Sequence, residues 1–420
     1  MSARAAPLPP VPDLRGPPPL GPPPPQRPRL VQVLGDEGFR LFFPLAAAHA
    51  ALWPFLWIVV QGGDLAGART MPPMVWHMHE MIWGAWGAAL IGFLTTAFPE
   101  WTDTPVWRGR RLWALAGLWG VARLVGLVGW DALTPVAALA DIGWCAALLG
   151  YALAVTLRRR TDRLAAFAGW LAAFLAAEAV ARWGMVAGDV ALADAAIRAG
   201  GLVFLGMLGL ALSRIAVPVS NLILDPSEAT APFRPHPGRM NLGAGLVAVA
   251  VAGQVAGLSP AVTGWLMIAA GAGFADRIAD HFIGRAAFRA EIVMLGLAQA
   301  MAAAGLIWIG AARLGAPLAE AGGWHLALMG GLGMAVLAVM SIAGLFHAGR
   351  TLPVSGRVRL AAALLAAATA ARLAPELTGA DPGLAHAAAS VLWAGAFAAW
   401  AWHYLPILAD PASLGRREGC

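Results

Sequence analysis

Lysine is absent from this chain, and all 29 of its basic residues are arginine. Schiff-base and lysine-base mechanisms are therefore excluded, because both need a lysine amine. Charged residues of either sign make up only 12% of the 420 residues, about half the usual share of a soluble domain. Two cysteines, Cys145 and Cys420, provide neither a disulfide framework nor a thiolate metal cluster. The P-loop, dinucleotide, HExxH and Gly-x-Ser-x-Gly motifs are also missing.

Apolar residues dominate the composition of the chain. They form 59% of the chain, the mean hydropathy is +0.68, and 19 tryptophans stand beside two tyrosines. From Phe39 onward, apolar runs of about 18 to 25 residues recur, each long enough to cross about 30 Å of hydrocarbon. We therefore predict an all-α, polytopic membrane helix bundle of about twelve helices and exclude a soluble globular enzyme. The predicted spans are 39–60, 74–98, 110–130, 133–156, 163–186, 196–217, 240–258, 260–281, 288–310, 324–347, 357–375 and 383–408.

The arginines indicate the orientation of these spans. With the N-terminus inside, 23 arginines fall in cytoplasmic segments, whereas only Arg69, Arg198 and Arg313 fall in outer loops. Such a bias obeys the positive-inside rule and places both termini in the cytoplasm, in a multi-pass protein of the cell's inner membrane. The net charge of +6 is scattered over short loops rather than gathered on one face, so nucleic-acid binding is not expected.

Proline separates the N-terminal tail from the membrane domain. Residues 1–38 hold 12 of the 31 prolines, so we expect this tail to be disordered or polyproline-like. A polyproline partner site is possible there, although a plain linker is the favoured interpretation. The membrane domain is expected over residues 39–408, and residues 409–420 form a short C-terminal tail.

Three arginines lie inside predicted spans, in the outer half of the membrane: Arg123, Arg182 and Arg372. Buried ionisable groups in membranes are costly unless paired, so each is a functional candidate. Glu178 precedes Arg182 by one helical turn and could simply neutralise it. Alternatively, the three guanidiniums hold an anionic group between the helices, such as a pair of carboxylates or propionates.

Histidines mark both ends of the predicted bundle. His77, His79 and His325 begin near the outer face, whereas His347 lies near the inner face. Residues two apart on a helix point about 200° away from each other, so His77 and His79 share one metal only if the helix is irregular there. About 33 Å of helix separates His325 from His347, so these two cannot reach one centre. Glu80 shares a face with His77 and could fix its tautomer; hydrogen-bonded interhelical histidines are the simpler alternative.

Four blocks of the sequence resemble the NnrS family of multi-pass membrane proteins. The block around the outer histidines is the most specific. The similar blocks are Gly38-Phe39-Arg40-x-Phe42-Phe43, Trp76-His77-x-His79-Glu80-Met81 with its continuation to Thr102, Ser213-Arg214-Ile215 through Asn221, and His325 through Gly349-Arg350. The sequence departs from the family pattern at Ser341-Ile342, where an arginine is expected after the serine, and at His347-Ala348 in place of His-Thr.

This resemblance implies a twelve-helix protein that contains haem, expected to be of the b type, and copper, and that serves the cellular response to nitric oxide beside denitrification. It makes His77, His79, His325 and His347 candidate metal ligands. Arg214 joins Arg123, Arg182 and Arg372 as a candidate for cofactor binding, and Glu80 is the candidate catalytic group, orienting a ligand or relaying a proton.

Three functions follow from these observations. The leading hypothesis is a haem- and copper-binding protein whose metal binds nitric oxide from the lipid phase. Turnover, sensing and sequestration of the gas all stay open, so enzymatic activity is undecided, and no redox partner is identified. The second hypothesis is a secondary transporter that carries a small anion on its buried arginines. The third is a membrane scaffold whose histidines only bridge helices.

Overall fold

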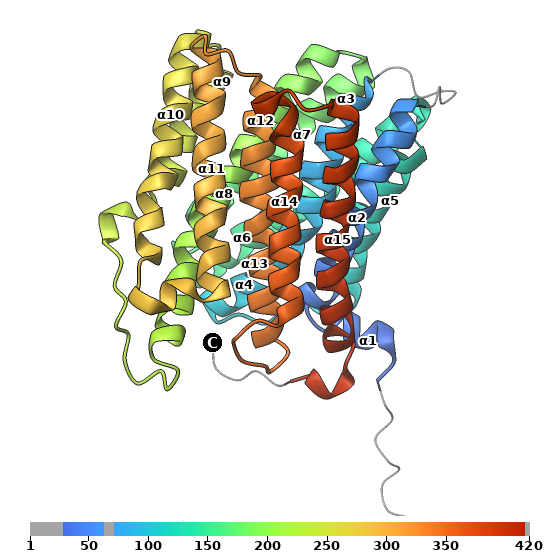
Figure 1. Cartoon of the computed structure of the whole chain (residues 1–420). Helices are drawn as coiled ribbons and strands as arrows, with labels where there is room; N and C mark the ends of the chain where they lie inside the picture. Colours follow the sequence, from blue (N-terminus) through green and yellow to red (C-terminus); the bar gives the residue numbers. More distant parts are fainter. Residues whose placement is uncertain (1–27, 63–70, 129, 416–420) are drawn as a thin grey trace, which may run out of the picture.

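A computed structural model describes residues 28–62, 71–128 and 130–415, and these residues form a bundle of helices without a β-strand (Figure 1). The predicted all-α bundle is thus confirmed. The α-helices are α1 (Leu30–Leu34), α2 (Gly38–Gly62), α3 (Pro73–His79), α4 (Gly87–Thr102), α5 (Arg110–Val128), α6 (Thr134–Arg159), α7 (Ala165–Ala187), α8 (Val190–Leu224), α9 (Leu242–Val255), α10 (Pro260–Asp276), α11 (Ala290–Arg313), α12 (Glu320–Trp324), α13 (Gly333–Phe346), α14 (Gly356–Thr378) and α15 (Pro382–Leu408).

Nine helical segments of the described chain are long and apolar enough to cross a membrane, which makes this a multi-pass membrane protein. The predicted number of twelve is not confirmed. The three remaining predicted spans fall on α5, α9 and α10. With 14 and 17 residues, α9 and α10 are shorter than the roughly 20 residues that a perpendicular crossing needs. The outer half of α5 carries Arg123, whose partners are described below.

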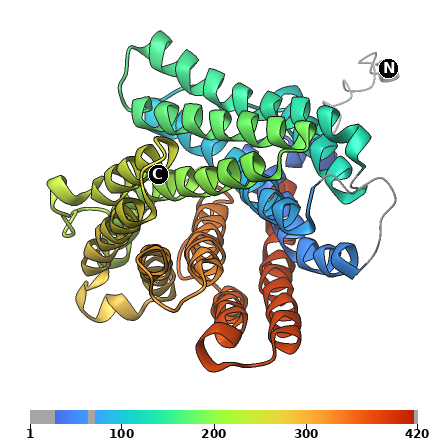
Figure 2. The ribbon, with the colours of Figure 1, turned by 90° about the horizontal axis from the view of Figure 1, so that it is seen from above.

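The span Pro73–Thr102 lies at the centre of the bundle. Within its apolar stretch 89% of the residues are buried, compared with 28% for α14 at the periphery. Seen from above, α5 to α8 lie on one side of the molecule, and α9 to α11 and α13 to α15 lie on the other (Figure 2). α4 packs against α2, and α2 packs in turn against α15, so the first and last spans are neighbours.

The two ends of the described chain are tied together on one side of the bundle (Figure 1). Buried Arg40 of α2 donates hydrogen bonds to the Leu408 carbonyl at 2.9 Å and to the side chain and carbonyl of Ser413. In the N-terminal segment predicted to be disordered, residues 30–34 form the short helix α1. The proline runs at residues 1–27 lie outside the described residues. Both ends on one side agree with an even number of crossings.

Both spans that carry outer histidines are interrupted by a π-helical segment. The segment η1 (Glu80–Trp86) links α3 to α4, and η6 (His325–Leu332) links α12 to α13. A π-turn holds one residue more than an α-turn, so it shifts the facing of the residues before it relative to those after it. Such segments are rare and concentrate at functional sites. Here, each lies directly beside a histidine of the outer group.

Candidate metal centre and buried ionic cluster

His77 and His325 face each other near one end of the bundle. His77 is in α3 and His325 is the first residue of η6, yet their ring centroids are 6.5 Å apart and their planes are 20° from parallel. Nδ1 of His325 donates a hydrogen bond to the Ala321 carbonyl at 2.8 Å, because a carbonyl can only accept. The neutral His325 ring therefore keeps its lone pair on Nε2, the nitrogen available to a metal.

α14 and α15 contribute further polar side chains near this histidine pair. Arg372 of α14 and His386 of α15 both lie within electrostatic range of His325. Arg372 is paired with Glu376 one turn later, at 4.0 Å, and both side chains are about four-fifths buried. The backbone of Gly322 lies against the Glu376 carboxylate, where no larger residue would fit. The histidine pair thus has the Arg372 guanidinium nearby, and the Glu376 carboxylate lies beside that guanidinium.

His79 serves a different site from His77. It is fully buried, and its Nε2 lies 3.0 Å from both carboxylate oxygens of Glu178 on α7. Its Nδ1 lies 3.6 Å from Glu80, and its ring stacks on Trp83 at 5.0 Å. His77 and His79 therefore point to different sites, as expected for residues two apart on a helix, although a π-helical segment begins directly after His79.

His79 belongs to a buried ionic cluster that joins α2, η1, α5, α6 and α7. Arg123 lies 3.0 Å from Glu80 and 2.5 Å from Asp141. Arg182 pairs with Glu178 at 3.0 Å and also with Asp141. His49 adds a contact of 3.3 Å to Glu80. No side chain in the cluster is more than 7% exposed.

The charges of this cluster almost cancel, with three carboxylates facing two guanidiniums. Ligand atoms of His79, Asp141 and Glu178 lie within 4.8 Å of one another, a spacing that could hold a metal ion. However, Arg182 contacts both carboxylates of that triad. A divalent cation beside two guanidiniums would place four positive charges against three negative ones, so the arrangement favours an ionic core over a metal site.

The arginines proposed to neutralise a cofactor therefore differ in the groups that surround them. Arg123 and Arg182 are engaged by buried carboxylates, which is the simpler alternative raised for Glu178. Arg372 is the one of these candidates that lies beside the histidine pair. Arg214 lies elsewhere, with its guanidinium 4.7 Å from the Trp101 ring.

His347 lies apart from the outer histidines, as the length of its span requires. Its Nε2 is 3.3 Å from Glu100, its Nδ1 is 3.6 Å from Glu37, and its ring packs against Phe39 at 5.0 Å. The structure thus divides the four candidate histidine ligands among three places, and only His77 and His325 come together.

Asp141 and His49 were not identified as site residues from the sequence. Asp141 stands alone in the apolar run from Val136 to Leu149, and a lone acidic residue in a span was itself a usable signal. His49 carried no comparable signal, because its partner Glu80 is 31 residues away in another span.

A family model described as NnrS protein matches residues 33–412, which include every histidine and arginine of these sites. No curated protein and no solved structure matches the chain.

Proposed function

Because the chain belongs to the NnrS family, we propose that it is a haem- and copper-binding protein of the cytoplasmic membrane that acts in the cellular response to nitric oxide, in cells that denitrify. The observation that carries this proposal is the pair formed by His77 and His325. Two imidazoles from distant spans meet beside two π-helical segments, and one of them has its tautomer fixed.

The residues at this pair fit a metal centre. Imidazole is a usual ligand for both iron and copper, at metal–nitrogen distances of about 2 Å, and 6.5 Å between the ring centroids leaves room for one ion. The hydrogen bond from His325 to Ala321 is the kind of support that orients metal-bound histidines. Arg372 supplies a guanidinium that could pair with a haem propionate.

When bound, copper held by the two imidazoles, or haem iron held by one of them, would supply an open coordination position for nitric oxide. The chain's own residues hold and orient the metal. His77 and His325 are the ligands, and Ala321 fixes the ring of His325. Ion pairs of the cluster hold His79, the last residue of α3, and Glu80, the first residue of η1. Because His77 precedes His79 by two residues in α3, its movement is also limited. Nitric oxide is small and uncharged, so it can reach this centre through the lipid.

The observed ion pairs argue against an anion carrier. Arg123, Arg182 and Arg372 each lie within 4.0 Å of at least one carboxylate. A transported anion would have to displace those carboxylates, of which Glu80, Asp141 and Glu178 are completely buried.

Metal content tests the proposal directly. Full-length protein purified in detergent, with iron and copper measured per chain, is compared with His77→Ala and His325→Ala. We expect each substitution to remove the same metal, because both ligands hold one ion. His236→Ala is the matched control, since His236 lies on an exposed loop and should leave both metals in place. A folded wild-type protein without iron or copper would overturn the proposal.

A further inference from the structure

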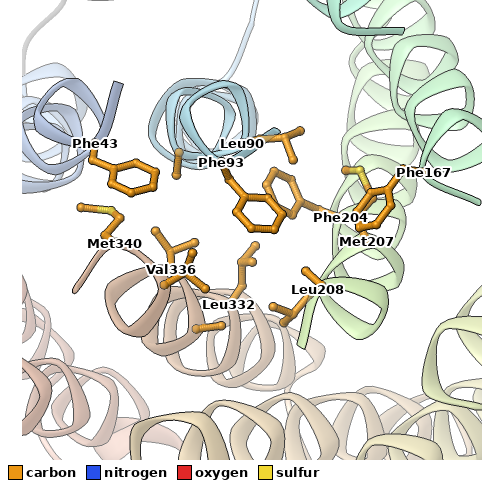
Figure 3. A pocket seen from close by; sticks show the side chains of 14 residues that line it. Phe43, Leu90, Phe93, Phe167, Phe204, Met207, Leu208, Leu332, Val336 and Met340 are labelled. Atoms are coloured by element: carbon orange, nitrogen blue, oxygen red, sulfur yellow. The ribbon is translucent and has the colours of Figure 1, made fainter. Parts of the chain in front are cut away.

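An apolar cavity of about 50 Å³, whose lining includes neither His77 nor His325, lies between α2, α4, α8 and α13 (Figure 3). Its lining side chains contain carbon and sulfur but no oxygen or nitrogen, and include Phe43, Leu90, Phe204, Met207 and Val336. The lining residues Phe93, Ala211 and Val339 are only half-buried, so the cavity reaches the molecular surface at their level.

Arg214 stands at one end of this cavity. It follows the lining residue Ala211 by about one turn of α8, and its guanidinium lies 5.0 Å from the ring of Phe167, which also lines the cavity. It lies 4.7 Å from the ring of Trp101, which packs on Phe93 of the lining at 5.8 Å. The aromatic rings therefore hold the cation against the cavity wall.

The charge of Arg214 is not neutralised by a neighbouring carboxylate in the described part of the chain. Its one hydrogen bond to protein is donated to the Arg163 carbonyl at 2.9 Å, and Arg163 itself donates to the Trp101 carbonyl. Both contacts involve Arg163 of the loop between α6 and α7. Together with the end of α6, this loop is rich in arginine (Arg158, Arg159, Arg160 and Arg163). The positive-inside rule places this loop at the cytoplasmic surface, the depth of lipid headgroups.

We propose that an anionic phospholipid of the inner leaflet binds at the surface opening of this cavity, with part of one acyl chain against the apolar side chains and the headgroup phosphate on Arg214. Charge complementarity supports this occupant over a neutral lipid, since the described residues of the site offer one guanidinium and no carboxylate beside it. A metal or haem is disfavoured because the lining contains neither histidine nor carboxylate. The inference goes beyond the proposed function and does not depend on it.

Photo-crosslinking tests this site in the full-length protein. The protein is reconstituted into vesicles that contain a trace of phosphatidylglycerol or phosphatidylcholine with a diazirine in the acyl chain, and labelled peptides are mapped by mass spectrometry. We expect phosphatidylglycerol to label segments 204–211 and 332–340 about fivefold more than phosphatidylcholine, the factor that corresponds to about 1 kcal/mol for one basic residue near the membrane surface.

Two variants and a control test whether Arg214 and the apolar cavity bind the lipid. Arg214→Gln should reduce labelling by phosphatidylglycerol to the level of phosphatidylcholine, and Ala211→Phe should fill the cavity and reduce labelling by both. Arg285→Gln removes an exposed arginine from another inner loop and should change nothing. Equal labelling by the two lipids, or labelling by phosphatidylglycerol that survives Arg214→Gln, would overturn the proposal. The iron and copper contents of Ala211→Phe should equal those of the wild type.

Discussion

Single residues in this protein show how a membrane interior accommodates charge. Each buried ion costs several kcal/mol to desolvate, and the cost is recovered only when the partners are close and well oriented. Glu80, Asp141 and Glu178 meet this condition, because Arg123 and Arg182 contact all three. The cluster therefore fixes α5, α6 and α7 relative to η1.

Removal of one carboxylate from this cluster should be costly. Glu178→Gln leaves Arg182 and His79 with less compensation, and we expect it to lower the free energy of unfolding by about 3–5 kcal/mol. Asp194→Asn is the matched control, because Asp194 also precedes its arginine by four residues but lies in a partly exposed pair. That change should cost about 1 kcal/mol or less. Detergent-denaturation curves of both variants measure the difference, and equal losses would contradict a stabilising cluster.

The two histidines of the His77-x-His79 motif should behave differently when changed. His79→Gln should lower the free energy of unfolding, because it disturbs Glu178, but it should leave the metals in place. His77→Gln should remove a metal with little change in stability. Metal analysis and unfolding curves on the same preparations separate these effects. If His79→Gln removes a metal from protein that remains folded, the assignment of His79 to the ionic cluster is wrong.

The spacing of residues along single helices predicted part of these contacts. The one-turn separation predicted the pair of Glu178 and Arg182, and the two-residue separation predicted that His77 and His79 diverge. The meeting of Asp141 with both arginines could not be predicted, because it depends on how three helices pack. The sequence places these residues at a similar depth but does not give the rotation of each helix.

At the scale of elements, the π-helical segments are the feature that sequence reasoning missed. Neither Glu80–Trp86 nor His325–Leu332 contains proline, and the glycines Gly84, Gly330 and Gly331 are common in membrane helices, so both segments look like ordinary apolar helix. A π-turn is stabilised by its neighbours rather than by its own residues. η1 packs on α2 and η6 packs on α11 and α14, so tertiary contacts decide the geometry.

Deletion of a single residue tests the role of η6. Removing Met329 should convert the π-helical segment to α-helix and rotate His325 by roughly 40° relative to α13, the difference between seven α-helical steps of about 100° and eight π-helical steps of about 82°. We expect the protein to fold with unchanged helix content but to lose the metal held by His77 and His325. Circular dichroism and metal analysis provide the two readouts. Retention of the metal after this deletion would show that the π-helical segment does not position the histidine.

For the whole molecule, the distribution of arginine predicted a polytopic bundle whose two ends share one side. The all-helical fold and the contact of α2 with α15 agree with it. The number of spans was harder to predict, because α9 and α10 are shorter than the apolar runs that contain them. Apolar composition marks which residues can enter lipid, but it does not show whether a short helix pair crosses.

Cysteine accessibility decides the topology of α9 and α10. Ala256 is exposed in the turn between these helices, and Ser227 is exposed in the loop after α8. A membrane-impermeant thiol reagent added to intact cells should label Ala256→Cys but not Ser227→Cys, because twelve crossings place the first outside and the second inside. Labelling of Ala256→Cys only after the cells are permeabilised would reduce the number of crossings to ten.

We propose that this protein carries a redox metal centre that binds nitric oxide. The most direct test is a reduced-minus-oxidised absorption spectrum of the purified full-length chain, recorded before and after addition of nitric oxide. The proposed metal centre predicts a haem band at a near-stoichiometric level that shifts when the gas is added. A folded protein that is colourless, or whose spectrum does not respond to nitric oxide, would contradict it.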